Sequence, residues 1–125
     1  MCIRDRVCCP LTPETHDLFD REAFARMPRG SMIVNVTRGE IIDADALIEA
    51  LDSGQLAGAG LDVVPIEPLP GDHPLWQRDD VVMTPHAAGA SQLRASKNID
   101  RFCGNLWRLR TGEPLEGLID KQTGY

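Results

Sequence analysis

Three residues with side chains suited to acid–base chemistry stand between positions 38 and 86 of the sequence: Arg38, Glu67 and His86. The planar guanidinium of Arg38 offers a fork of hydrogen-bond donors, which matches a carboxylate better than the point charge of a lysine does. Histidine is the residue type whose side chain changes charge near physiological pH, which makes His86 a candidate for proton transfer. A carboxylate such as Glu67, hydrogen-bonded to that ring, would fix its orientation and favour its protonated form. Together the three residue types can bind an anion and move a proton, provided that the fold brings them to one place.

Helix signals recur along the chain on either side of these residues. Asp20 and Asp43 are suited to cap two short helices, which Gly30 and Gly54 would end. A longer helix near the C-terminus is predicted by apolar residues at helical spacing and by the stop signal at Gly112. The apolar positions of that helix are Ile99, Phe102, Cys103, Leu106 and Leu109.

Apolar segments between these helices predict three strands, at residues 31–36, 56–64 and 81–84. The first two are rich in β-branched or small residues, which fits strands buried on both faces of a sheet. Residues 65–74 contain four prolines and a glycine and predict a loop. Alternating strands and helices imply an α/β fold, in which a parallel sheet carries helices on its faces.

A parallel sheet of this kind would gather the three chemically active residues at one edge. Arg38 follows the first of these strands, Glu67 follows the second and His86 follows the third. Ligands of open α/β sheets bind beyond the carboxyl ends of the strands. The sequence therefore predicts an active site at this edge.

Composition excludes several classes of partner. The net charge of −6 and the acidic pI near 4.9 argue against nucleic acid, since phosphate contacts need a basic face. No apolar run approaches the length of a membrane span, and the N-terminus lacks the apolar stretch of a signal peptide. We therefore expect a cytoplasmic protein with neither a nucleic-acid nor a membrane partner.

Cysteine spacing gives no indication of a disulfide framework or a metal site. Cys2, Cys8, Cys9 and Cys103 form no CxxC motif, and an adjacent pair is a poor disulfide candidate. The three histidines do not cluster with the cysteines at zinc-finger spacing either. We expect buried free thiols in a reducing cytoplasm, and no bound metal.

Several motifs closely resemble the D-isomer-specific 2-hydroxyacid dehydrogenase family, which includes D-lactate, phosphoglycerate and formate dehydrogenases and the glyoxylate/hydroxypyruvate reductases. The motifs are PLTPETHDLFD, VNVTRGEIIDADALIEAL, LAGAGLDVVPIEPLPGDHPLW and VVMTPHAAGAS. Their order and spacing are consistent from about Val7 to the C-terminus, which is far more specific than a lone fingerprint. The resemblance implies an NAD(P)-dependent oxidoreductase, with a Rossmann-like doubly wound sheet, that interconverts small 2-keto acids and D-2-hydroxy acids.

The resemblance also implies roles for individual residues. Arg38, Glu67 and His86 would be the catalytic trio, with Arg38 on the substrate carboxylate and carbonyl and His86 as the acid/base. Asp62 would lie near the nicotinamide amide, and Cys9 and Pro10 near the adenosine half. The full implied cofactor set is Cys9, Pro10, Val36, Thr37, Arg38, Asp62, His86 and Gly89. The cofactor would be NAD or NADP, with NAD favoured, and the parent protein a homodimer.

One family feature has no counterpart in the sequence, namely the GxGxxG turn that holds the pyrophosphate. GAGLDV (58–63) imitates it but lies inside a predicted strand and runs into a proline instead of opening a helix. We therefore expect a fragment, with the C-terminal half of the dinucleotide-binding domain at 7–92. Residues 93–125 would be a crossover helix and the C-terminal segment of a substrate domain that is otherwise absent. Residues 1–6 place three charges where a buried strand is expected, and we interpret them as a non-native start left by a sequencing artefact.

Simpler interpretations compete with each assignment. Arg38 could be a surface arginine near a helix start, His86 a turn histidine, Glu67 an exposed loop acid and Asp62 a turn cap. For the whole chain, the alternatives are a genuine short protein, a nucleotide-sensing binding module of the co-repressor type, and an inactive fragment.

Overall fold

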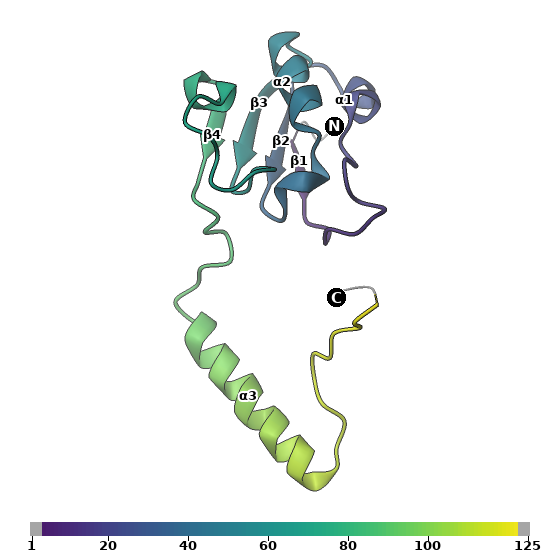
Figure 1. Ribbon diagram of the computed structural model, residues 1–125, viewed down its shortest axis with the longest axis vertical. Helices are drawn as coiled ribbons and strands as arrows, with labels where there is room; N and C mark the ends of the chain where they lie inside the picture. Colours follow the sequence, from purple (N-terminus) through teal and green to yellow (C-terminus); the bar gives the residue numbers. More distant parts are fainter. Residues whose placement is uncertain (1–3, 123–125) are drawn as a thin grey trace. The chain divides into compact units, whose positions relative to one another are not determined.

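The structure is a computed structural model that describes residues 4–122 and divides the chain into two compact units, Met1–Ala88 and Gly89–Tyr125. The first unit contains a four-stranded sheet, and the second contains one long helix (Figure 1). All of the residues from the strand ends singled out above, except Gly89, belong to the first unit.

The sheet is formed by β1 (Arg4–Val7), β2 (Ser31–Asn35), β3 (Leu56–Leu61) and β4 (Val81–Met83). The strands lie in the order β1-β2-β3-β4, and every neighbouring pair is parallel. The predicted α/β architecture with a parallel sheet is therefore confirmed. β3 ends three residues earlier than predicted, so that Asp62 lies just beyond its carboxyl end.

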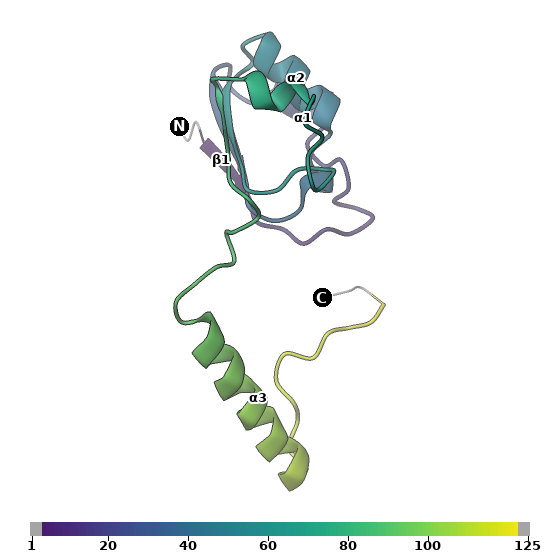
Figure 2. The ribbon, with the colours of Figure 1, turned by 60° about the vertical axis from the view of Figure 1, so that its left-hand side comes forward.

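Two short helices connect the strands, α1 (Arg21–Arg26) and α2 (Ala44–Asp52). Both begin at the predicted aspartates, because the side chains of Asp20 and Asp43 accept hydrogen bonds from backbone N–H groups of the first turn. Both helices cover the same face of the sheet (Figure 2). This follows from the strand order, since right-handed crossovers that step in one direction place every connection on one side.

Burial is correspondingly one-sided. Phe24, Ile33 and Leu47 are buried where α1 and α2 cover the sheet. On the opposite face Met32 remains 43% exposed and Val82 69% exposed. The prediction that residues 31–36 would be buried on both faces is thus wrong within the described residues, because no element of the first unit covers the second face.

The N-terminal charges lie at a sheet edge rather than in its centre. Arg6 is exposed within β1, and edge strands tolerate charged side chains. The cost of burial therefore does not argue against Arg6 as part of a strand. The interpretation of residues 1–6 as a non-native start stays a prediction, and residues 1–3 lie outside the described residues.

The prediction of buried thiols is wrong for two of the cysteines. Cys8 and Cys103 are exposed, and Cys9 is half-buried against the core. Cys8 directly follows an edge strand, where no neighbouring element covers it. Cys2 lies outside the described residues.

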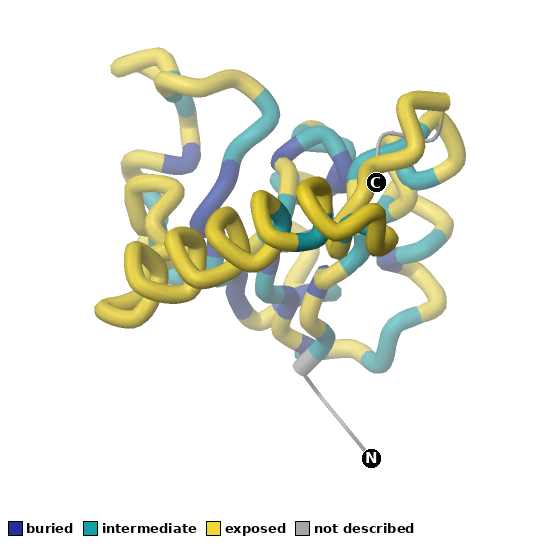
Figure 3. The backbone as a smooth tube through the Cα atoms, turned by 90° about the horizontal axis from the view of Figure 1, so that it is seen from below, coloured by how far each residue is buried: buried dark blue, intermediate teal, exposed yellow. Residues whose placement is uncertain are grey.

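The second unit consists of α3 (Arg94–Thr111) and a tail that folds back on it through paired hydrogen bonds between Asn105 and the backbone of Glu116. As predicted, Gly112 ends this helix in a left-handed conformation, with φ at 75°. No residue of α3 is buried, and the helix is yellow along almost its whole length in Figure 3. Within residues 4–122, no helix has both the length and the apolar character needed to cross a membrane.

Candidate active site

The three residues expected to act together do converge at the carboxyl edge of the sheet. Arg38 lies three residues after β2, Glu67 in the loop after β3, and His86 three residues after β4. All three line one cavity of about 330 Å³. Parallel strands place their carboxyl ends at the same edge, which is why segments far apart in the sequence meet here.

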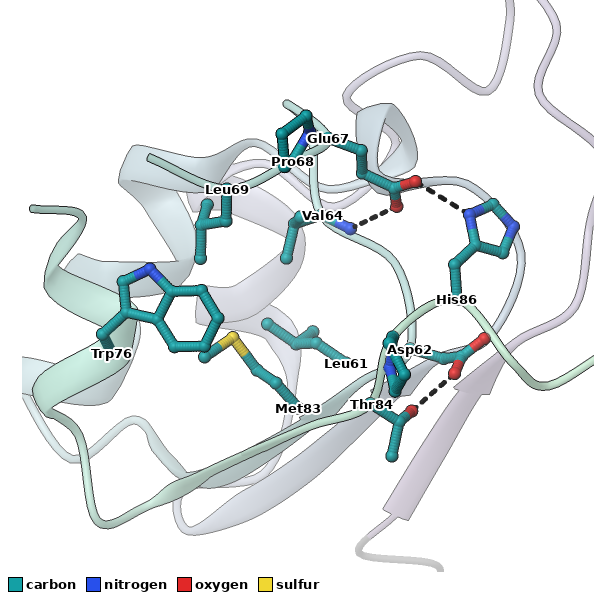
Figure 4. A pocket seen from close by; sticks show the side chains of 11 residues that line it. Leu61, Asp62, Val64, Glu67, Pro68, Leu69, Trp76, Met83, Thr84 and His86 are labelled. Atoms are coloured by element: carbon teal, nitrogen blue, oxygen red, sulfur yellow. Dashed lines mark hydrogen bonds and ion pairs between the residues drawn. The ribbon is translucent and has the colours of Figure 1, made fainter. Parts of the chain in front are cut away.

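His86 and Glu67 form a direct pair. Nδ1 of His86 lies 2.8 Å from Oε2 of Glu67, and Oε1 of Glu67 accepts a hydrogen bond from the backbone N–H of Val64 (Figure 4). The hydrogen bond from His86, aided by the Val64 N–H and the positive charge of Arg38, holds the pKa of Glu67 below its ordinary value. Glu67 is therefore an ionised acceptor near neutral pH, and the proton of the pair belongs on Nδ1. Among the described residues, Nε2 of the ring has no hydrogen-bond partner and is free to face a substrate.

Asp62 holds the turn that carries His86. The backbone of His86 has a positive φ of 51°, which residues other than glycine rarely adopt. The backbone N–H of His86 donates to the Asp62 carbonyl. The Asp62 carboxylate, 7% exposed, accepts from the Thr84 hydroxyl and from the N–H groups of Ala87 and Ala88. These bonds, the Thr84 hydroxyl first, lower the pKa of Asp62. The turn-capping interpretation of Asp62 therefore describes its contacts, and one lone pair of Oδ2 remains for a further donor.

The turn that carries Arg38 is held against the Glu67 loop. Arg38 is exposed and directly precedes a short 3-10 helix, and its backbone carbonyl accepts a hydrogen bond from the buried side chain of Asn35. Gly39 packs against the backbone of Val64, where an added Cβ would lie 2.0 Å from the Val64 carbonyl carbon. The absence of a side chain at Gly39 thus lets the Arg38 turn and the Glu67 loop touch. Neither Asn35 nor Gly39 was given a role from the sequence, although an asparagine that ends an apolar strand signals a buried amide in need of partners.

A second cavity of about 410 Å³ shares Glu67 and His86 with the first (Figure 4). Its apolar walls come from Leu61, Leu69, Met83 and the ring of Trp76. Trp76, which the sequence analysis did not single out, is anchored by its Nε1, which donates to a backbone carbonyl at 2.8 Å. Glu67 and His86 therefore lie beside an apolar surface.

The other implied cofactor residues lie at the same edge. Cys9 and Pro10 follow β1, and Val36 and Thr37 follow β2. Gly89 belongs to the second unit, and its role stays a prediction. Within residues 4–122, no group of three or more His, Cys, Asp or Glu side chains is arranged to hold a metal ion.

Comparison with known proteins places these features in one family. Residues 6–88 match the family described as D-isomer specific 2-hydroxyacid dehydrogenase, NAD binding domain. A glyoxylate reductase of Korarchaeum cryptofilum is 41% identical over 113 residues, which cover 90% of this chain and 34% of the relative. A glyoxylate/hydroxypyruvate reductase A of Serratia proteamaculans is 38% identical over 116 residues, which cover 93% and 36%.

Solved structures agree with these sequence relatives. A D-isomer specific 2-hydroxyacid dehydrogenase from Xanthobacter autotrophicus, in complex with NADPH and MES, has a TM-score of 0.89 and 42% identity, and the match covers 98% of this chain and 50% of that one. An NADPH-dependent glyoxylate/hydroxypyruvate reductase from Sinorhizobium meliloti, in complex with NADP and sulfate, has a TM-score of 0.88 and 35% identity, with coverage of 98% and 40%.

These comparisons bear on two expectations. The chain spans only about a third to a half of the length of these relatives. The two solved relatives contain NADPH or NADP, so the expected preference for NAD gains no support. Because the match covers residues 6–88 and the fold agrees with it, the chain belongs to the D-isomer-specific 2-hydroxyacid dehydrogenase family, and those residues belong to its NAD-binding domain.

Proposed function

We propose that this chain is the catalytic part of an NAD(P)-dependent oxidoreductase that interconverts small 2-keto acids and D-2-hydroxy acids. The reaction would be of the glyoxylate/hydroxypyruvate reductase or phosphoglycerate dehydrogenase type. The observation that carries the proposal is the 2.8 Å contact between His86 Nδ1 and Glu67 Oε2, in a cavity that Arg38 also lines. Relatives at about 40% identity are named glyoxylate or glyoxylate/hydroxypyruvate reductases, which supports the same reaction class.

Each residue of the trio has a distinct task in this proposal. Arg38 uses one N–H for the carbonyl of Thr37, and its remaining donors bind the substrate carboxylate and the ketone oxygen. His86 gives the proton on Nε2 to the ketone oxygen during reduction and recovers a proton from the hydroxyl in the reverse direction. Glu67 orients the ring and stabilises the imidazolium by its negative charge. The nicotinamide cofactor, when bound, supplies or accepts the hydride at the substrate carbon.

The residues present fit one half of such a cofactor. Thr37 and Asp62 lie at neighbouring strand ends, and the Asp62 carboxylate has one lone pair left for an amide donor. The sequence contains no GxGxxG turn for the pyrophosphate. We therefore propose that upstream sequence supplies that turn and most of the substrate domain in a longer, homodimeric cytoplasmic enzyme, termed the complete enzyme below. NADPH is the cofactor to test first, because one solved relative contains NADPH and another contains NADP.

The test begins with long-read sequencing of the source DNA upstream of the Met1 codon. We expect the reading frame to continue to a GxGxxG turn, and stop codons directly upstream would contradict the complete enzyme. The complete product is then assayed with glyoxylate or hydroxypyruvate and either NADPH or NADH, alongside the 125-residue chain. We expect cofactor oxidation by the complete enzyme and none by the chain alone. Cofactor binding without turnover of any keto acid would instead support the co-repressor type of sensor.

A further inference from the structure

We propose that Asn35 is a positioning residue, which holds Arg38 in the orientation that binds the substrate carboxylate. The inference rests on the proposed function of Arg38 and adds a residue that touches neither substrate nor cofactor. Asn35 is the last residue of β2 and is 1% exposed, so its carboxamide is fully removed from water. A buried amide without partners destabilises the fold, and the partners that it finds show what it holds in place.

The Asn35 carboxamide is bonded on both sides to the turn that contains Arg38. Its Nδ2 donates to the backbone carbonyl of Arg38 at 2.8 Å. Its Oδ1 accepts from the backbone N–H of Thr37 at 3.1 Å and from the Thr37 hydroxyl at 3.0 Å. The turn is thus wrapped around one side chain, which fixes the two residues that lead to and include Arg38.

These contacts require an amide at position 35. An aspartate has the same shape but no donor, and its second oxygen would face the carbonyl oxygen of Arg38. An alanine would leave the Arg38 carbonyl and both Thr37 groups without this partner. Only a carboxamide presents a donor and an acceptor at the two places where the turn needs them.

The position of this turn determines where the guanidinium stands. Arg38 has an extended backbone, and its Nη1 donates to the carbonyl of Thr37, so the side chain is tied to the same turn that Asn35 holds. The backbone carbonyl of Asn35 accepts from the N–H of Asp62, which connects the turn to the strand end behind His86. On the outer side, Gly39 rests on the backbone of Val64. Loss of the Asn35 amide removes the inner support of Arg38 while the outer wall remains.

A buried polar residue could equally serve only the stability of the strand end, and the chain offers a control for that role. Ser31 lies at the opposite end of β2, is also 1% exposed, and donates its hydroxyl to the carbonyl of Pro28. Ser31→Ala therefore removes a buried hydrogen bond from the same strand without touching the Arg38 turn.

The experiment is a double-mutant cycle in the complete enzyme saturated with NADPH, with oxalate as the probe for the carboxylate site. We expect Asn35→Ala to weaken oxalate binding roughly 10- to 100-fold, the cost of a misplaced binding group. In the Arg38→Ala background the same change should alter oxalate binding less than about twofold, because a residue that acts through Arg38 has nothing left to position. Ser31→Ala should leave oxalate binding unchanged.

Asn35→Asp serves as the second variant in case Asn35→Ala does not fold, because aspartate keeps the shape of the side chain. We expect Asn35→Asp to weaken oxalate binding by the same factor. Equal losses of oxalate binding with and without Arg38 would show that Asn35 does not act through Arg38 and would overturn the inference. If the wild-type enzyme reduces keto acids but the substitutions at position 35 leave oxalate binding unchanged, the inference is overturned and the proposed function remains intact. A wild-type enzyme that neither binds oxalate nor reduces any keto acid would overturn both.

Discussion

Replacement of Gly39 by alanine tests whether contact between the Arg38 turn and the Glu67 loop is needed for activity. An added Cβ would lie 2.0 Å from the carbonyl carbon of Val64, 2.1 Å from its oxygen and 2.3 Å from the nitrogen of Pro65. All three are backbone atoms, so no side-chain rotation can relieve the overlap.

The geometry sets the size of the expected effect. Ordinary contact begins at 3.4 Å, so the two segments must move apart by about 1.4 Å. A displacement of about 1 Å between catalytic groups can cost on the order of 100-fold in rate. Overpacking of a buried contact typically costs ~1–3 kcal/mol of stability. Gly39→Ala should therefore lower kcat/KM of the complete enzyme by about 100-fold. It should also destabilise the fold by ~1–3 kcal/mol.

Steady-state kinetics and urea denaturation measure the two effects. Gly71→Ala is the matched control, because an added Cβ there meets nothing within 4 Å and the residue lies in the same proline-rich loop as Glu67. The control should change stability by less than about 0.5 kcal/mol and leave kcat/KM unchanged. If Gly39→Ala keeps kcat/KM within threefold of the wild type, the argument that this contact aligns the catalytic groups is wrong.

Three further predictions concern the remaining site residues. His86→Ala should lower kcat of the complete enzyme by about 10²–10⁴-fold, and unchanged turnover would remove His86 from the mechanism. The second prediction concerns Glu67, whose pKa is held below its ordinary value of 4.5 by the hydrogen bond from His86. Near pH 4.5 the unfolded state therefore binds more protons than the folded state does. Stability should therefore fall as the pH drops through 4.5 toward the folded value, and urea unfolding of Glu67→Gln should show a weaker loss; an identical loss would contradict the assignment. Asp62→Ala removes three hydrogen bonds that hold the turn of His86, which should destabilise the protein in urea unfolding and also lower kcat. A stable variant with wild-type kcat would show that the turn holds His86 without Asp62.

The helix starts and the parallel sheet could be predicted from local sequence signals. Asp20 and Asp43 cap helices through hydrogen bonds to the first turn, which depend only on residues a few positions away. The convergence of Arg38, Glu67 and His86 was accessible for a different reason, since each follows a strand and parallel strands end at one edge.

The exposure of one face of the sheet could not be predicted from the same signals. An apolar run predicts a strand between two covered faces, but it carries no information on which side the connecting helices pass. The hand of the crossovers puts both helices on one side, so that Met32 and Val82 stay exposed in the described structure.

For this protein the sequence by itself determined the chemical groups and the strand ends from which they project, because residue identity and periodicity are local properties. The tertiary structure alone decided how these groups meet. The 2.8 Å contact between Glu67 and His86 and the close approach of Gly39 to Val64 each join segments from different parts of the chain. Distances and orientations between such segments depend on how their loops pack against each other, and this packing is a property of the whole fold.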